Sequence, residues 1–271
     1  MKLRMLAAAL LLPLLLVVLL ALPALFTMVL VGLMTAVAVY ELLWGTGLVK
    51  QPRLVAYSAV MGFFAAVWSF CGMSYVWFLL GILLFSSALF AEVLASHGKL
   101  PFSTFALCAV GGMLIPFLLT ALVRIRCMEQ GKALVLIPFA VAFLSDSGAY
   151  FAGRFFGKHK LAPVISPNKT IEGMVGGVLA GILGMIIFCL VLQLAFGFRI
   201  NYAFAVLYGF IGSQAGVFGD LAFSAIKRQT GIKDYGNLIP GHGGVLDRFD
   251  SMVIIAPLVE ALLILIPVAV K

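Results

Sequence analysis

The residues best suited to chemistry lie between Asp220 and Asp250, a stretch with four carboxylates, four Lys or Arg residues and a histidine. A solvated surface loop can carry as many charges, but it does not need His242-Gly243-Gly244 flanked by a regular set of opposite charges. Glycines permit backbone conformations that direct N–H groups at an anion. Mg²⁺ takes one or two carboxylates and completes its shell with water and phosphate oxygens. The stretch therefore predicts a site for a metal and a phosphate-containing substrate.

Two relationships inside this stretch support a shared site. Asp247 and Asp250 are three residues apart and share one face if the segment is helical. Asp220, near the end of the preceding helix, can approach Asp247 at the same depth. We expect the other candidates for holding phosphate or ordering the site to be Ser224, Lys227, Arg228, Lys233, Asp234, His242, Gly243, Gly244, Arg248 and Asp250. For His242, a hydrogen bond that shapes the loop is the alternative to a contact with phosphate.

A second polar stretch precedes this one. Asp146 lies inside an otherwise apolar run, where a buried carboxylate needs a cation or a donor, so a functional role is the first hypothesis. Near the start of the following apolar run stand four more site candidates: Lys169, and Ser166, Thr170 and Glu172, which we expect to bind substrate. Ser166 or Thr170 can cap a helix there, and free N–H groups with Lys169 can hold a phosphate. A capped helix with a solvated basic loop explains this segment equally well.

The amino-acid composition indicates which kind of structural element positions these polar residues. Of the 271 residues 64% are hydrophobic and 10% charged, and the mean hydropathy is +1.20. Soluble domains carry about 25% charged residues, so the chain is predicted to be an all-α polytopic membrane protein. Residues 5–40 suit two crossings broken near Pro23, and seven further runs make nine: 54–70, 75–94, 102–123, 133–152, 171–196, 202–226 and 252–270.

With nine spans and the N-terminus inside, 13 of the 18 Lys and Arg residues fall on the inner side. This bias predicts a cytoplasmic active site in a bacterial-type cell membrane. In this orientation the outer side carries the basic residues Arg124, Arg126 and Lys132, which argue against it. Whatever the orientation, both polar loops lie on one face. The net charge of +8 does not imply nucleic-acid binding, because basic cytoplasmic loops are common in membrane proteins.

We interpret residues 1–132 as a scaffold of about five spans and residues 133–271 as the catalytic region of about four. Glu41, Glu92 and His97 stand near span ends, where a solvated rim explains them. Gly173, Gly177 and Gly181 are four apart, which lets another helix approach closely, inside the bundle or between the subunits of a homodimer. The four cysteines lack metal-site spacing and are predicted to pack in the core.

The segment 224–250, SAIKRQTGIKDYGNLIPGHGGVLDRFD, resembles the signature of the phosphatidate cytidylyltransferase family (CDP-diacylglycerol synthases). The upstream elements D-S-x-A-Y-F-x-G from Asp146 and S-P-x-K-T-x-E-G from Ser166 are similar to the family's other motifs. Asn168 and Ile171 depart from the residues most frequent in that family, which are basic and aromatic. The match covers residues 146–250.

The resemblance implies transfer of CMP from CTP to phosphatidic acid in the bilayer, with release of pyrophosphate. It implies Mg²⁺ bound by Asp220 and Asp247, and a second, monovalent cation such as K⁺ nearby. Asp220, Asp247, Lys227, Lys169 and Asp146 are then the catalytic candidates. The lipid phosphate is already ionised, so positioning and charge neutralisation should dominate over base catalysis.

Two alternatives remain at this point. One is a related CTP-using membrane enzyme, either an ether-lipid CDP synthase or a polyprenol kinase. The other is a cation-coupled transporter of an organic phosphate with Asp146 and Asp220 as coupling sites, which would place polar groups near the membrane midplane. An enzyme would gather them at one membrane face.

Overall fold

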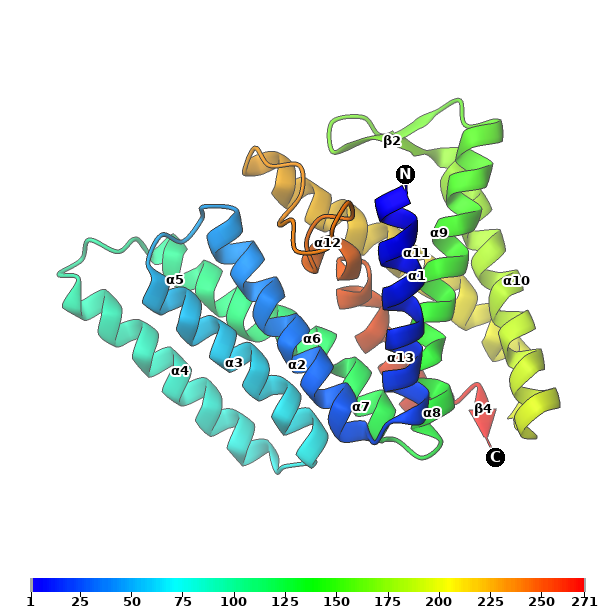
Figure 1. Ribbon diagram of the computed structural model, residues 1–271, viewed down its shortest axis with the longest axis horizontal. Helices are drawn as coiled ribbons and strands as arrows, with labels where there is room; N and C mark the ends of the chain where they lie inside the picture. The colour runs from blue at the N-terminus through cyan, green and yellow to red at the C-terminus, as the bar shows by residue number, and fades with distance from the viewer. Residues whose placement is uncertain (1, 271) are drawn as a thin grey trace. The chain divides into compact units, whose positions relative to one another are not determined.

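The computed structural model describes the backbone of residues 2–270 and the side chains of residues 9–270. Helices make up most of the chain (Figure 1). The chain forms two compact units: unit 1 contains the residues up to Cys127 together with Gln229–Phe249, and unit 2 contains Met128–Arg228 and the residues from Asp250 onward. The loop 229–249 thus belongs to the same compact unit as the N-terminal helices, and the functional division at residue 132 stays a prediction.

Unit 1 begins with α1 (Lys2–Leu16), which ends in the π-helical turn η1 (Val17–Ala21). The chain leaves the helical conformation at Leu22 and Pro23 and resumes as α2 (Ala24–Tyr40), which continues into a second π-helical turn, η2 (Glu41–Gly45). Proline has no N–H to continue the ladder and restricts the residue before it. The predicted break near Pro23 is confirmed.

The rest of unit 1 consists of apolar helices. α3 (Pro52–Cys71) and α4 (Tyr75–Ala95) are joined by a turn in which Gly72 has φ +56, and α2, α3 and α4 run side by side (Figure 1). The segments α5 (Phe102–Ala109), η3 (Val110–Leu114), α6 (Ile115–Leu119) and α7 (Ala121–Cys127) follow as one apolar span of 26 residues. The short α12 (Leu246–Phe249) completes the unit.

The arginines of α7 are used inside unit 1. The Arg126 side chain is buried and donates to the carbonyl oxygens of Leu19 at 2.9 Å and Leu22 at 3.0 Å. Arg124 donates to Phe117 O and stacks over that ring, 4.7 Å from its centroid. Both guanidinium groups therefore bind carbonyl oxygens near helix ends, a structural task that accounts for basic residues on the side where the charge bias did not expect them.

Unit 2 contains α8 (Gly131–Leu134), α9 (Leu136–Phe156), α10 (Ile171–Phe196), α11 (Tyr202–Gln229) and α13 (Met252–Leu265). Between α9 and α10, β1 (Lys160–Ala162) and β2 (Ser166–Thr170) pair antiparallel. A second small pairing joins β3 (Arg199–Ile200) to β4 (Ala269–Val270).

Glycines set the helix contacts of unit 2. A Cβ atom on Gly148 would meet the side chain of Ala180, and one on Gly176 would meet Ala152, so α9 and α10 lie backbone to backbone. Gly181 approaches Ser213 and Gly209 of α11 in the same way. The predicted packing role of Gly173, Gly177 and Gly181 is confirmed, and all three act within unit 2. Because small residues allow this approach, the helices gain close van der Waals contact.

Seven helices in residues 2–270 are long and apolar enough to cross a membrane, so the chain has the predicted class of an all-α polytopic membrane protein. The predicted count of nine is not confirmed. The last run was expected to span 252–270, but α13 has 14 residues and reaches about 21 Å, short of the roughly 30 Å of a hydrocarbon core. It ends before Pro267, which disfavours helix at Ile266. The first helical run is also short, since its apolar part covers only Ala9–Ala21.

Apolar side chains on the outside of these helices fit a lipid environment. On α4, Tyr75, Leu84 and Leu94 are each more than 70% exposed. A water-soluble helix would place charged residues there. The cysteines are free: Cys108 and Cys189 are buried as predicted, whereas Cys71 and Cys127 are exposed.

Candidate functional site

Unit 1 carries a glycine loop, residues 233–246, that leads into α12. Its backbone turns at Gly241 and Gly243, which have φ +75 and +87, a region open to glycine and costly for other residues. The turn is closed by two backbone hydrogen bonds of 2.9 Å, from His242 N to Ile239 O and from Ile239 N to Gly243 O. Of the predicted pair Gly243 and Gly244, Gly243 thus adopts a conformation that favours glycine.

Two buried carboxylates hold the end of the glycine loop. Asp247 Oδ2 accepts hydrogen bonds from Tyr235 N at 2.8 Å and Gly244 N at 2.9 Å. Glu41 accepts from Val245 N at 3.0 Å and Leu246 N at 2.8 Å. Of the two glycines expected to direct N–H groups at a bound anion, Gly244 thus donates to a carboxylate of the protein itself.

The prediction for Glu41 was wrong. It was assigned to a solvated rim, but the residue is only 4% exposed and lies where α2 passes into η2. The signal was present in the sequence: an acidic residue inside a long apolar run has to be paired or hydrogen-bonded. Its partners lie more than 200 residues further along the chain, so no local pattern identified them.

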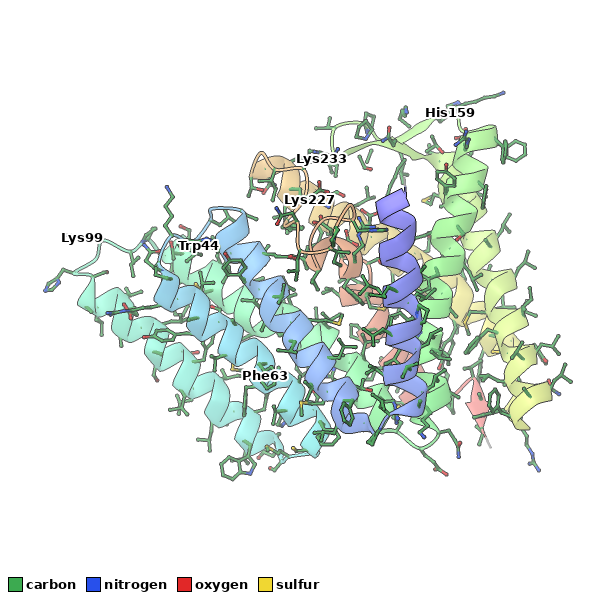
Figure 2. All side chains as sticks on the ribbon, in the orientation of Figure 1. Trp44, Phe63, Lys99, His159, Lys227 and Lys233 are labelled. Carbon is green, nitrogen blue, oxygen red and sulfur yellow. The ribbon has the colours of Figure 1, made fainter. Side chains whose placement is uncertain are left out.

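A pocket of about 470 Å³ opens beside the glycine loop, within the usual size range of small-molecule sites. Its lining is mostly polar and consists of Lys233, Asp234, Gly236, Asn237, Ile239, Gly241, His242, Gly243 and Arg248. Figure 2 shows Lys233 on this loop. Among the described side chains, His242 Nδ1 is a buried atom that lacks a hydrogen-bond partner. The pocket therefore combines two cationic side chains, Lys233 and Arg248, with the Asp234 carboxylate and the His242 imidazole, whose Nδ1 is turned away from the accessible surface.

Unit 2 carries a second polar centre around Asp220. Lys169 Nζ lies 2.5 Å from Asp220 Oδ2, and Ser224 Oγ donates to Asp220 Oδ1 at 3.1 Å. Asp220 and Ser224 are one turn apart on α11, while Lys169 comes from β2. The structure thus brings three of the predicted site residues together, and a cation already stands at the Asp220 carboxylate.

Asp250 is buried near this centre. Its Oδ1 accepts a hydrogen bond from Ser251 N at 2.7 Å. Burial raises the pKa of Asp250 to about 7, and the negative charge of Asp220 adds to the rise, while the Ser251 N–H, Lys227 and Lys169 oppose it. The premise that Asp247 and Asp250 share a helical face is not met, because α12 ends at Phe249.

The turn between α9 and β1 is fixed by Glu172, which we expected to bind substrate. Glu172 accepts hydrogen bonds from Lys158 N and His159 N and lies 2.6 Å from His159 Nδ1. Figure 2 shows His159 beside the end of α9. The Glu172 carboxylate thus holds the turn in place. The sequence motifs did not identify His159 as its partner.

The other predicted residues of unit 2 are distributed along the hairpin and the helices. Thr170 caps α10 as predicted, accepting from Gly173 N at 3.1 Å, while Ser166 stands at the start of β2. Arg228 Nε donates to Ile165 O at 3.1 Å. The side chain of Asp146 is exposed on α9 rather than buried as we assumed.

The donors present suit a hard cation. Among the described residues, no cluster of three or more His, Cys, Asp or Glu side chains could hold a metal ion. Mg²⁺ does not need such a cluster, because it keeps several waters and uses one or two carboxylates with substrate phosphate. Asp220 fits this role, since it already pairs with a cation. Asp220 belongs to unit 2 and Asp247 to unit 1. Their predicted approach to one another therefore stays a prediction.

Comparison with known proteins adds a family relationship. The model of the cytidylyltransferase family matches residues 2–266. The chain is 37% identical to a phosphatidate cytidylyltransferase of Bacillus subtilis over 246 residues, which are 88% of each chain. It is 47% identical to the protein of that name from Staphylococcus epidermidis over 136 residues and 45% identical to that of Staphylococcus aureus over 141. In both staphylococcal cases the match spans about half of each protein, 50% of this chain and 51% of the relative.

Proposed function

The chain belongs to the cytidylyltransferase family, and on this premise we propose that it transfers CMP from CTP to phosphatidic acid, giving CDP-diacylglycerol and pyrophosphate. The observation that carries the proposal is the similarity to the Bacillus subtilis phosphatidate cytidylyltransferase along most of both chains. The membrane-spanning fold fits a lipid substrate, which can reach the protein through the bilayer while a nucleotide arrives from water.

The pocket beside the glycine loop is proposed to hold the triphosphate of CTP. Lys233 and Arg248 line it and would neutralise phosphate oxygens, which is the main requirement of phosphoryl-group transfer. His242 also lines the pocket, and its imidazole would contact an oxygen of the nucleotide or of departing pyrophosphate. Because the N–H groups of residues 244–246 are occupied, side chains rather than a backbone nest would do this binding.

For Mg²⁺ we propose Asp220 and Asp247 as ligands, as the family resemblance implies. Bound Mg²⁺ would neutralise charge on phosphate oxygens and orient them. Lys169, now paired with Asp220, would turn to phosphate when substrate is present, with Ser224 holding the carboxylate in place. Lys227 and Arg228 would add positive charge at the end of α11.

In the proposed reaction an oxygen of the phosphatidate phosphate attacks the α-phosphorus of CTP. The new P–O bond forms as the bond between the α-phosphorus and the oxygen bridging to the β-phosphorus breaks, and the electron pair leaves with pyrophosphate. The attacking oxygen is already ionised, so no side chain has to remove a proton.

We propose that the active site faces the cytoplasm, as the distribution of Lys and Arg favours. The same orientation gives CTP access from water. A homodimer remains an expectation from the sequence alone, because the glycines offered for subunit packing are used between helices of unit 2.

A labelling assay tests the function. The purified protein is incubated with phosphatidic acid, Mg²⁺ and CTP labelled at the α- or the γ-phosphorus, with and without EDTA. We expect the α-label alone to enter the lipid, and only with Mg²⁺. In a parallel incubation with a polyprenol in place of phosphatidic acid, transfer of the γ-label to the polyprenol would instead identify a kinase. Mg²⁺-independent uptake of organic phosphate by proteoliposomes, without any labelled lipid, would identify a transporter.

A further inference from the structure

Glu41 is a buried acid at the end of a membrane-spanning helix. It lies in the apolar span Ala24–Gly45, where α2 gives way to the π-helical turn η2. Such turns are rare and occur often at functional sites. A carboxylate that is 4% exposed in this setting is costly unless donors satisfy it, so its partners indicate why it is there.

Those partners are the backbone N–H groups that lead into α12. Glu41 Oε1 accepts from Val245 N and Oε2 from Leu246 N, so both oxygens are engaged by the protein. The next residue is Asp247, whose own carboxylate accepts from Gly244 N and Tyr235 N. Three consecutive N–H groups, 244–246, are thus divided between the two carboxylates.

Steric contacts show how closely the glycine loop lies on the end of α2. A Cβ atom on Gly236 or on Gly244 would collide with the Glu41 carboxylate, and one on Gly45 would collide with Tyr235 O. Gly236 lines the pocket, and Gly244 directly follows Gly243, which also lines it. Glu41 therefore touches both flanks of the loop that forms the pocket.

We propose that Glu41 is a positioning residue for the transfer reaction: it fixes the glycine loop so that Asp247 and the pocket residues keep their places, without touching substrate. This inference rests on the proposed function. The N-terminal helices, which we interpreted from the sequence as a scaffold, would then also help to order the active site.

The closing experiment compares Glu41→Gln and Glu41→Asp with the matched control Glu92→Gln. Glu92 is another acid of the N-terminal half; its Oε1 accepts from Tyr57 at 3.3 Å and it has no bond to the glycine loop among those observed. Gln keeps the size of Glu41 but turns an NH₂ donor toward one of the two N–H groups. Asp keeps the charge and both acceptor oxygens on a shorter side chain.

Two readouts are measured on each protein in the same detergent: hydrogen–deuterium exchange of peptides covering 234–247, and the steady-state rate of CMP transfer with varied CTP. Glu41→Gln should speed exchange in that segment alone and lower kcat/KM by about tenfold or more, as loss of a charge-assisted hydrogen bond implies. Glu41→Asp should recover part of both losses, and Glu92→Gln should resemble wild type.

Each contrary result is decisive. Wild-type exchange in 234–247 of Glu41→Gln would show that Glu41 does not fix the loop. Faster exchange throughout the protein, or equal effects in Glu92→Gln, would reduce Glu41 to a general stability role and overturn the proposal. If Glu41→Gln does not fold, the comparison of Glu41→Asp with Glu92→Gln decides in the same way. A wild-type protein without CMP transfer would refute the proposed function, while the exchange readout would still decide whether Glu41 holds the loop.

Discussion

Lys169 Nζ and Asp220 Oδ2 are 2.5 Å apart, although 51 positions separate the two residues. Lys169 comes from the hairpin before α10, and Asp220 comes from α11 after the chain has passed along α10. Both side chains are partly exposed, so the pair can separate when a phosphate competes for the ammonium group. An ion pair of this kind keeps a cation ready beside a carboxylate that is proposed to bind metal.

Replacing Lys169 should impair catalysis more than folding. Because a positioned cation stabilises charge on phosphate, Lys169→Met should lower kcat/KM for CTP by about 10- to 100-fold, with partial activity in Lys169→Arg. The control is Lys160→Met on the same hairpin, whose Nζ donates to Pro167 O. Similar kinetics for Lys169→Met and Lys160→Met would remove Lys169 from the site.

The pocket beside the glycine loop makes a separate prediction. Lys233→Ala and Arg248→Ala should each raise the KM for CTP about tenfold, since each removes a charge-assisted contact to phosphate. Lys99→Ala, in the loop between α4 and α5 and labelled in Figure 2, is the matched surface control. Steady-state kinetics at fixed ionic strength measure the effect. If the KM for CTP in both pocket variants equals that of Lys99→Ala, the nucleotide binds elsewhere.

We expect Asp250 to make the stability of the metal-free protein depend on pH. Burial gives this carboxyl a folded-state pKa of about 7 against its ordinary value of 3.8, so the folded state holds a proton that the unfolded state releases in this window. The free energy of unfolding should therefore decrease as the pH rises from about 4 through about 7. Asp250→Asn should flatten that slope. Thermal unfolding in EDTA across this range provides the test, and an unchanged slope in the variant would exclude Asp250 as its source.

The contact between α9 and α10 should tolerate no added volume. Gly176→Val places atoms where Ala152 of α9 already lies, and overpacking of this kind costs about 1–3 kcal/mol. Leu179→Ala is the control, because Leu179 is 57% exposed on the same helix. The midpoint of thermal unfolding in detergent should fall for Gly176→Val more than for Leu179→Ala. The reverse order would contradict the close approach.

The positions of the longer helices could be predicted from composition and prolines, because an apolar run and a proline act locally. The break before Pro23, the turn after Cys71 and the bounds of α10 were predicted in this way. The end of α13 was not predicted, because Pro267 interrupts the helix inside a run that is apolar throughout. Thr170 as a helix cap also followed from local sequence.

The amino-acid sequence by itself determined that the chain has the composition of a membrane-spanning protein, and it singled out the scarce polar residues that are candidates for the chemistry, because burial in lipid selects composition residue by residue. Only the tertiary structure decided which partners those residues have. In the structure Lys169 pairs with Asp220 and Glu172 contacts His159. Glu41 accepts a hydrogen bond from a loop that lies about 200 residues further along the chain. Hydrogen bonds and ion pairs depend on distances of a few ångströms, and such distances between remote segments are set by helix packing rather than by spacing along the chain.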